Sequence, residues 1–182
     1  MTIGLVKESM DLESRVALVP DDVALIVQKG VEVLVENNAG ANSGYSNEAY
    51  ESVGAKIVDP KTAWGQDLVV KCKEPLEHEY PLLKEKATLF SYLDLAYQKS
   101  LCEMFIDKKI TSICTETIAG PKNDYPILAP MSVVAGRLAA LLKLRQKNKC
   151  VWLPKSIKKG AHFSKEGFTI APFRLPLRRL GW

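Results

Sequence analysis

Two lysines, Lys71 and Lys73, follow directly on an apolar run in the stretch DLVVKCKEP at residues 67–75. Because side chains alternate along a strand, we expect both ammonium groups to lie on the same face. Ligands of parallel α/β proteins bind where strands end, and a compact ammonium there can polarise a substrate carbonyl. The alternative is a strand end whose lysines are simply solvated.

Four further residues have side chains that can bind or react. Arg15 can hold a carboxylate with two parallel hydrogen bonds, although a plain surface arginine is the simpler interpretation. Asp94 follows an apolar run and can act as a general base or as a helix N-cap. The lysines would lower the pKa of the Cys72 thiol, but alternation turns Cys72 away from them and favours a buried, inert thiol. Met131 can line a pocket or belong to the core.

Apolar runs and amphipathic stretches alternate over residues 1–115, which predicts a parallel, doubly wound α/β sheet of the Rossmann-like or flavodoxin-like kind. Helix patterns open at Pro20-Asp21-Asp22, where an aspartate is the expected N-cap, and at Ser46. The predicted strands cover residues 2–6, 31–35, 56–58, 68–72, 88–92 and 110–114, with a weaker candidate at 168–171. The predicted helices cover residues 20–29, 46–53, 76–84, 98–108 and 130–142.

Composition limits the classes of protein to which the chain can belong. With 182 residues, 47% of them hydrophobic, it can build one packed domain. Its four cysteines form no Cys-x-x-Cys pair and only two histidines are present, which disfavours both a disulfide framework and a zinc site. No apolar run approaches a membrane span or a signal peptide. We therefore expect a cytoplasmic protein without a metal or a membrane partner.

Charge is distributed unevenly along the chain. Residues 141–182 hold eleven of the 25 Lys and Arg residues but one of the 21 acidic residues, so this tail carries +10 and the remainder −6. Such an asymmetry is typical of tails that bind nucleic acid. No nucleic-acid-binding motif accompanies it, so we do not expect a nucleic-acid partner. The chain also has neither a Gly-x-Gly-x-x-Gly turn nor a phosphate-binding loop, so no nucleotide site is recognised.

Several motifs, in order over residues 1–140, resemble the N-terminal domain of the alanine dehydrogenase and pyridine nucleotide transhydrogenase family. The Lys-x-Lys-Glu-Pro and Leu-Ala-Pro-Met-Ser pieces favour alanine dehydrogenase over transhydrogenase. The matching segments are GLVKE (4–8), ESRVALVP (13–20), GVEVLVE (30–36), VKCKEP (70–75), TET (115–117), LAPMS (128–132) and VAGRLA (134–139).

The resemblance implies an oxidoreductase that interconverts L-alanine and pyruvate, with NAD as hydride carrier and ammonia released. By motif, Arg15 would hold the substrate carboxylate, Lys73 would contact the carbonyl or amine centre, and Met131 would line the pocket. Lys71 would lie one pleat deeper. Asp94 stands where the family has its catalytic histidine. A histidine near pKa ~6.5 exchanges protons at neutral pH, whereas an aspartate near ~3.9 is normally ionised already, so a catalytic role for Asp94 is doubtful.

We expect three segments: a substrate-side domain over residues 1–128, an interdomain helix over 129–142, and a poorly ordered basic tail over 143–182. The family's NAD-binding domain is not recognised in the sequence, which predicts a truncated enzyme with negligible turnover by itself. The alternative is a non-catalytic module that binds 2-oxo acids through Arg15 and Lys73. A further alternative is an assembly module, which would pair with a second copy or dock on a full-length relative.

Overall fold

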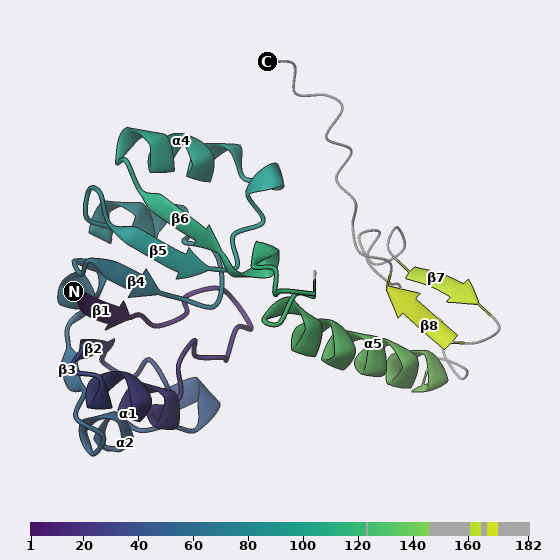
Figure 1. Cartoon of the computed structure of the whole chain (residues 1–182), viewed down its shortest axis with the longest axis horizontal. Coiled ribbons are helices and arrows are strands. Elements are labelled where there is room, and N and C mark those ends of the chain that lie inside the picture. Colours follow the sequence, from purple (N-terminus) through teal and green to yellow (C-terminus); the bar gives the residue numbers. More distant parts are fainter. Residues whose placement is uncertain (123, 146–160, 165–166, 171–182) are drawn as a thin grey trace. The chain divides into compact units, whose positions relative to one another are not determined.

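The structure, a computed structural model, describes residues 1–122, 124–145, 161–164 and 167–170 (Figure 1). The chain divides into two compact units, Met1–Ile118 and Ala119–Trp182. The described part of the second unit contains helix α5 (Leu128–Arg145) and an antiparallel hairpin of β7 (Ala161–Ser164) and β8 (Gly167–Ile170). Most of the basic tail, for which we expect poor order, lies outside the described residues.

The first unit is built on a sheet of six parallel strands in the order β3-β2-β1-β4-β5-β6. This arrangement confirms the predicted doubly wound α/β fold. Between β1 and β4 the strand order changes direction, and ligands of such folds bind outside the carboxyl ends of the strands at that point. The strands are β1 (Thr2–Leu5), β2 (Glu32–Glu36), β3 (Lys56–Val58), β4 (Leu68–Val70), β5 (Thr88–Ser91) and β6 (Thr111–Cys114).

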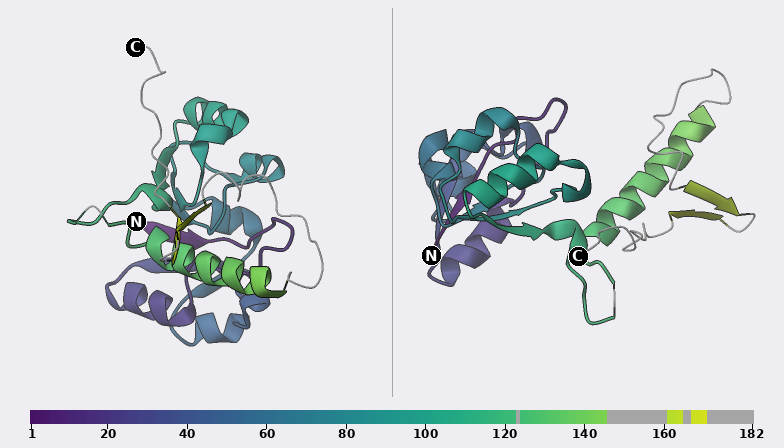
Figure 2. Two further views of the ribbon diagram at one scale, coloured as in Figure 1. Left: turned by 90° about the vertical axis from the view of Figure 1, so that its right-hand side faces the viewer. Right: turned by 90° about the horizontal axis from the view of Figure 1, so that it is seen from above.

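Helices cover both faces of this sheet (Figure 2). On one face, Val23 of α1 (Pro20–Gln28) and Tyr50 of α2 (Asn47–Glu51) pack with buried strand residues such as Leu5. On the other face, Trp64 of α3 (Pro60–Trp64) and Leu101 of α4 (Lys99–Asp107) pack with strand residues of the opposite pleat. The alternation of side chains along each strand therefore supplies two separate hydrophobic cores.

Short 3-10 helices complete the unit, and one of them corrects a prediction. The helix predicted over residues 76–84 is wrong, because the segment forms only the 3-10 helix η2 (Glu77–Leu82) with Pro81 inside it; proline removes a backbone donor that an α-helix needs. The other 3-10 helices are η1 (Ala41–Ser43), η3 (Leu95–Tyr97) and η4 (Thr115–Thr117).

Two helix starts also differ from the sequence-based expectation. The N-cap of α1 is Val19 rather than an aspartate, and Asp22 accepts a hydrogen bond from the Val19 backbone N–H at 3.4 Å. Helix α3 was not predicted, although Asp59 caps it in the expected way by accepting from the Thr62 backbone N–H at 3.1 Å. Five residues are too few to show helical periodicity.

Candidate functional site

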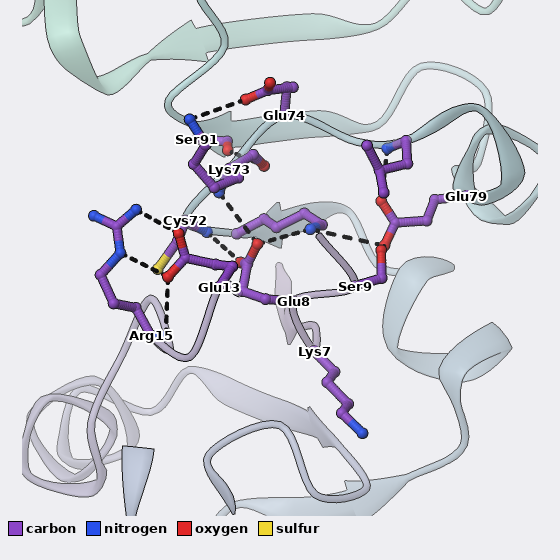
Figure 3. A network of polar contacts seen from close by, with 12 residues as sticks. Lys7, Glu8, Ser9, Glu13, Arg15, Cys72, Lys73, Glu74, Glu79 and Ser91 are labelled. Carbon is purple, nitrogen blue, oxygen red and sulfur yellow. Dashed lines mark hydrogen bonds and ion pairs between the residues drawn. The ribbon is translucent and has the colours of Figure 1, made fainter. Parts of the chain in front are cut away.

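The candidate site lies where β1 and β4 end and their chains separate. The Val6 backbone N–H still donates to the Val70 carbonyl at 3.4 Å, in line with the strand pairing. Beyond that point the Glu8 carboxylate lies between the two chains (Figure 3). Its Oε1 accepts from the Cys72 backbone N–H at 2.6 Å, and its Oε2 accepts from the Lys73 backbone N–H at 3.3 Å. One side chain thus holds the backbone that carries the candidate lysine.

Lys71 is a buried structural cation. Its side chain is 0% exposed, and its Nζ lies 2.8 Å from Glu8 Oε2 and 3.7 Å from Glu79 Oε1. A buried ammonium is costly unless it is paired and hydrogen-bonded. The alternative of solvated lysines is therefore wrong for Lys71. Strand β4 ends at Val70, two residues earlier than predicted. The alternation of side chains along a strand therefore does not extend to Lys71 and Lys73, and their side chains lie in different environments.

Lys73 is the more accessible of the two lysines. Its side chain is 32% exposed and its Nζ lies 3.5 Å from Glu74 Oε2. The Ser91 hydroxyl, which is fully buried, donates to the Lys73 carbonyl at 2.7 Å. A rigid backbone and a partly exposed ammonium are what a substrate-binding lysine requires, and that role remains a prediction.

Arg15 is held by Glu13 through a two-pronged ion pair. Arg15 Nε donates to Glu13 Oε1 at 2.8 Å and Nη2 donates to Oε2 at 2.6 Å, while the Arg15 backbone N–H also donates to Oε1 at 3.0 Å. These hydrogen bonds lower the pKa of the Glu13 carboxyl to about 2, and the same pair raises the pKa of Arg15 above its usual range. The positive charge of Lys73 makes a smaller contribution that also lowers the pKa of Glu13.

The Cys72 thiol lies beside this group (Figure 3). Burial raises its pKa to about 12, and the negative charge of Glu8 acts in the same direction, against the opposing effect of Arg15. A thiol with a raised pKa is a poor nucleophile at neutral pH because the thiolate is the reactive form. The interpretation of Cys72 as an inert thiol is therefore favoured over the activated one.

Asp94 occupies a constrained turn after β5. Its backbone has φ 43° and ψ 45°, a left-handed conformation that aspartate tolerates better than most residues. The Asp94 backbone N–H donates to Glu116 Oε1 at 2.8 Å, and the Leu93 N–H donates to the same oxygen at 3.1 Å. Asp94 stands at the N-cap of η3 without a side-chain capping bond. Asp94 is exposed, and a role for it in proton transfer remains a prediction.

Met131 lies in α5, in the second unit. The assignment of Met131 to the substrate pocket remains a prediction.

A cavity of about 320 Å³ adjoins Glu8 at the carboxyl ends of β1 and β2. The predicted residues Arg15, Lys73 and Asp94 do not line it. Burial raises the pKa of the Glu36 carboxyl in its wall, although the Lys7 backbone N–H donates to Glu36 Oε2 at 3.1 Å. The lining residues are Lys7, Glu8, Ser9, Glu36, Pro60, Trp64, His78, Glu79 and Leu82.

Sequence reasoning missed the acidic residues that organise this region, namely Glu8, Glu79 and Glu116. Glu8 and Glu116 belong to the motifs GLVKE and TET, which were the available signal. Within the described residues, no group of three or more His, Cys, Asp or Glu side chains is arranged to hold a metal ion. In the same part of the chain, no helix is both long enough and apolar enough to cross a membrane.

Comparison with known proteins supports the resemblance seen in the motifs. Alanine dehydrogenases of Staphylococcus epidermidis and Bacillus subtilis are each 47% identical to the chain, over 140 and 141 residues. These matches cover 76% and 77% of this chain but only 38% and 37% of the relatives, so the chain spans well under half of their length.

Solved structures give a consistent result. An L-alanine dehydrogenase superposes with a TM-score of 0.75 at 40% identity, over 78% of this chain and 40% of its own. A transhydrogenase from Sinorhizobium meliloti shares the fold, with a TM-score of 0.62 at 24% identity, over 65% of this chain and 36% of its own. Residues 4–135 match the family model described as "Alanine dehydrogenase/PNT, N-terminal domain", and the chain therefore belongs to that family.

Proposed function

We propose that this chain is the substrate-side part of an NAD-dependent alanine dehydrogenase, which binds pyruvate or L-alanine through Arg15 and Lys73. The observation that carries the proposal is that Arg15, held by Glu13, lies in one network of polar side chains with Lys73 at the carboxyl ends of β1 and β4 (Figure 3). The β1–β4 separation is also the point in the strand order where doubly wound proteins bind ligands. The proposal further draws on the family to which the chain belongs.

The chemistry of the two cations suits a small 2-oxo acid. A guanidinium matches the two oxygens of a carboxylate, and an ammonium stabilises negative charge on a carbonyl oxygen. Glu13 accepts hydrogen bonds from Nε and Nη2 of Arg15 and so fixes the direction of its guanidinium. In this proposal Arg15 orients the substrate and Lys73 polarises its reacting carbon.

The residues at the first strand-to-helix connection do not fit NAD. A dinucleotide's pyrophosphate binds at a glycine-rich turn and the N-terminus of the following helix. Here Glu8 and Glu13 lie in the connection after β1, and Asp21 and Asp22 stand in the first turn of α1. Carboxylates at these places repel phosphate. Dependence on NAD therefore enters this proposal through the family alone.

Thermal unfolding in the presence of pyruvate tests the substrate-binding role. A ligand that binds only the folded state raises the melting temperature, with about 2.7 kcal/mol of stabilisation at a hundredfold excess over Kd. We expect pyruvate to stabilise the unmodified chain and the control Lys56→Ala, which removes an exposed cation paired with Glu32. We expect no pyruvate-dependent shift in Arg15→Ala, and an undiminished shift there would contradict the proposal.

A second candidate is a 2-oxo-acid-binding module without catalysis. It is favoured by the location of both cations within the first unit, together with the acidic connection that does not fit NAD. Incubation of the purified chain with NADH, pyruvate and ammonium separates the two functions. Oxidation of NADH above the blank supports the dehydrogenase, whereas pyruvate binding without oxidation supports the module.

A further inference from the structure

We propose that Glu8 is a positioning residue for Lys73: its buried carboxylate replaces β1 as hydrogen-bond acceptor for the backbone at Cys72 and Lys73. The substrate-binding part of this inference rests on the proposed function, because it concerns the direction in which the Lys73 ammonium is presented. The backbone part rests on the structure alone.

The backbone after β4 lies between the chain that follows β1 and the chain of β5. It makes backbone hydrogen bonds only with the β5 side. On the β5 side, the Lys71 backbone N–H donates to the Phe90 carbonyl at 3.1 Å, and the Tyr92 N–H donates to the Cys72 carbonyl at 3.3 Å. On the β1 side, the backbone pairing has ended. The backbone N–H groups of Cys72 and Lys73 are partly buried and require acceptors, and the two Glu8 oxygens provide them.

Lys71 makes this arrangement possible by supplying the countercharge. Glu8 and Lys71 have side chains that are 2% and 0% exposed, so the carboxylate would be strongly disfavoured there without its ammonium partner. Glu79 lies on the far side of the same ammonium at 3.7 Å. Glu79 also accepts hydrogen bonds from the Ser9 hydroxyl at 2.7 Å and from the Leu76 backbone N–H at 2.8 Å. Glu79 therefore shares the charge of Lys71 with Glu8, whereas the backbone N–H groups of Cys72 and Lys73 donate to Glu8.

The position of the backbone at residue 73 determines where the ammonium can reach. Glu8 holds its N–H and Ser91 holds its carbonyl, so both backbone polar groups of Lys73 are fixed. A misplacement of about 1 Å in a binding or catalytic group can cost on the order of a hundredfold in rate. Removal of Glu8 should therefore act on Lys73 even though the two side chains are not paired.

Amide hydrogen exchange in the whole chain tests the backbone part. In Glu8→Leu/Lys71→Met, both partners of the closest buried ion pair are removed together, which is often tolerated where removal of one is not, and Glu79 keeps its hydrogen bonds from the Ser9 hydroxyl and the Leu76 N–H. We expect the Cys72 and Lys73 amides of this variant to exchange at least ~10-fold faster, with protection of the core amide of Leu89 retained. Glu79→Gln is the matched control and should leave both amides protected.

Glu8→Gln provides a second variant if the double change does not fold. Its carbonyl oxygen can take the place of only one of the two carboxylate oxygens, and the NH2 group at the other place cannot accept. One of the Cys72 and Lys73 amides should therefore exchange faster and the other should stay protected. Unchanged protection of both amides in a folded Glu8 variant would overturn the inference.

A double-mutant comparison tests the coupling to substrate. Lys73→Ala should weaken pyruvate binding by roughly 10-fold in the unmodified chain and by less than about 2-fold in Glu8→Leu/Lys71→Met, because residues that act as a unit are not additive. Arg15→Ala should weaken binding in both backgrounds. Equal losses from Lys73→Ala in both would overturn the coupling. Absence of pyruvate binding by the unmodified chain would instead contradict the proposed function, and the exchange measurement would still decide the role of Glu8.

Discussion

At the scale of single residues, the two lysines after β4 show how position rather than residue type decides a role. Lys71 and Lys73 are separated only by Cys72, yet Lys71 is fully buried against two carboxylates and Lys73 is about a third exposed. The sequence identified Lys73 and Arg15 by their motifs. It did not predict that Glu8 pairs with Lys71, because that contact joins residues 63 positions apart and exists only once β1 and β4 lie side by side.

The Glu13–Arg15 pair predicts a dependence of stability on acid. The pKa of Glu13 is lowered from 4.5 to about 2 in the folded chain, so its contribution is present above pH 4.5 and is lost as the pH falls toward 2. We expect Glu13→Gln to lower the free energy of unfolding by about 1 kcal/mol at pH 7, since the half-exposed Arg15 is screened by water. Urea unfolding at pH 7, 4 and 2.5 measures this.

The difference between the Glu13 variant and the unmodified chain should shrink across that range and vanish near pH 2. Glu103→Gln is a suitable control, because its pair with Lys99 at 3.5 Å is exposed on α4 and should contribute little at any pH. A loss that is independent of pH would show that Glu13 acts through packing rather than through its charge.

At the scale of elements, the approach of α3 to β1 depends on the absence of a side chain at Gly4. A Cβ there would lie 1.9 Å from the Ala63 carbonyl oxygen, a backbone atom that cannot move aside cheaply. We expect Gly4→Ala to cost roughly 2–4 kcal/mol, as overpacking in a core does. Thermal unfolding of the variant measures the cost.

Gly30→Ala is the matched control for Gly4. It introduces the same methyl group after α1, where nothing lies within 4 Å but φ is +78°. Only backbone strain of about 1 kcal/mol should result. Equal costs at the two glycines would contradict the close packing of α3 on β1.

Glu36, at the end of β2, should affect the pH dependence of stability in the opposite sense to Glu13. Burial raises its pKa above 4.5 in the folded chain, so the folded state favours the protonated carboxyl and ionisation at neutral pH costs stability. We expect Glu36→Gln to raise the melting temperature at pH 7 by a few degrees. The gain should diminish as the pH falls through the raised pKa and should be absent below 4.5.

Glu32→Gln, at the exposed start of the same strand, controls for the loss of a charge. Its partner Lys56 lies 2.6 Å away but both side chains are well exposed, so little change is expected. Differential scanning calorimetry at pH 7 and pH 4 measures both variants. A lower melting temperature for Glu36→Gln at pH 7 would contradict the assignment of a buried, destabilising carboxylate.

The elements also show which features of a fold can be predicted from sequence. All six strands of the sheet were predicted within two residues at each end, because their apolar runs are bounded by polar or glycine residues. Helix α3 was missed because it is short. The segment of η2 was predicted as an α-helix because its apolar residues have helical spacing, although it contains Pro81. Long-range polar networks leave no periodic pattern, so the carboxylates around Lys71 could not be assigned partners.

At the scale of the whole molecule, both hydrophobic cores lie inside the first unit. Every residue of the two clusters falls between Ile3 and Cys114, and the unit ends at Ile118. A domain of this size can bury enough apolar surface to fold independently. We therefore expect a fragment of residues 1–118 to unfold cooperatively, with a melting temperature close to that of the intact chain.

The same fragment separates the contributions of the two units to substrate binding. Arg15 and Lys73 are retained in it, whereas Met131 in α5 is removed. If the two cations suffice, calorimetric titration should give the fragment and the intact chain the same affinity for pyruvate. A fragment that folds but binds pyruvate more weakly would assign part of the affinity to the second unit. Met131→Ala in the intact chain would then decide whether this methionine lines the pocket, because truncation of a contacting apolar side chain should reproduce the loss.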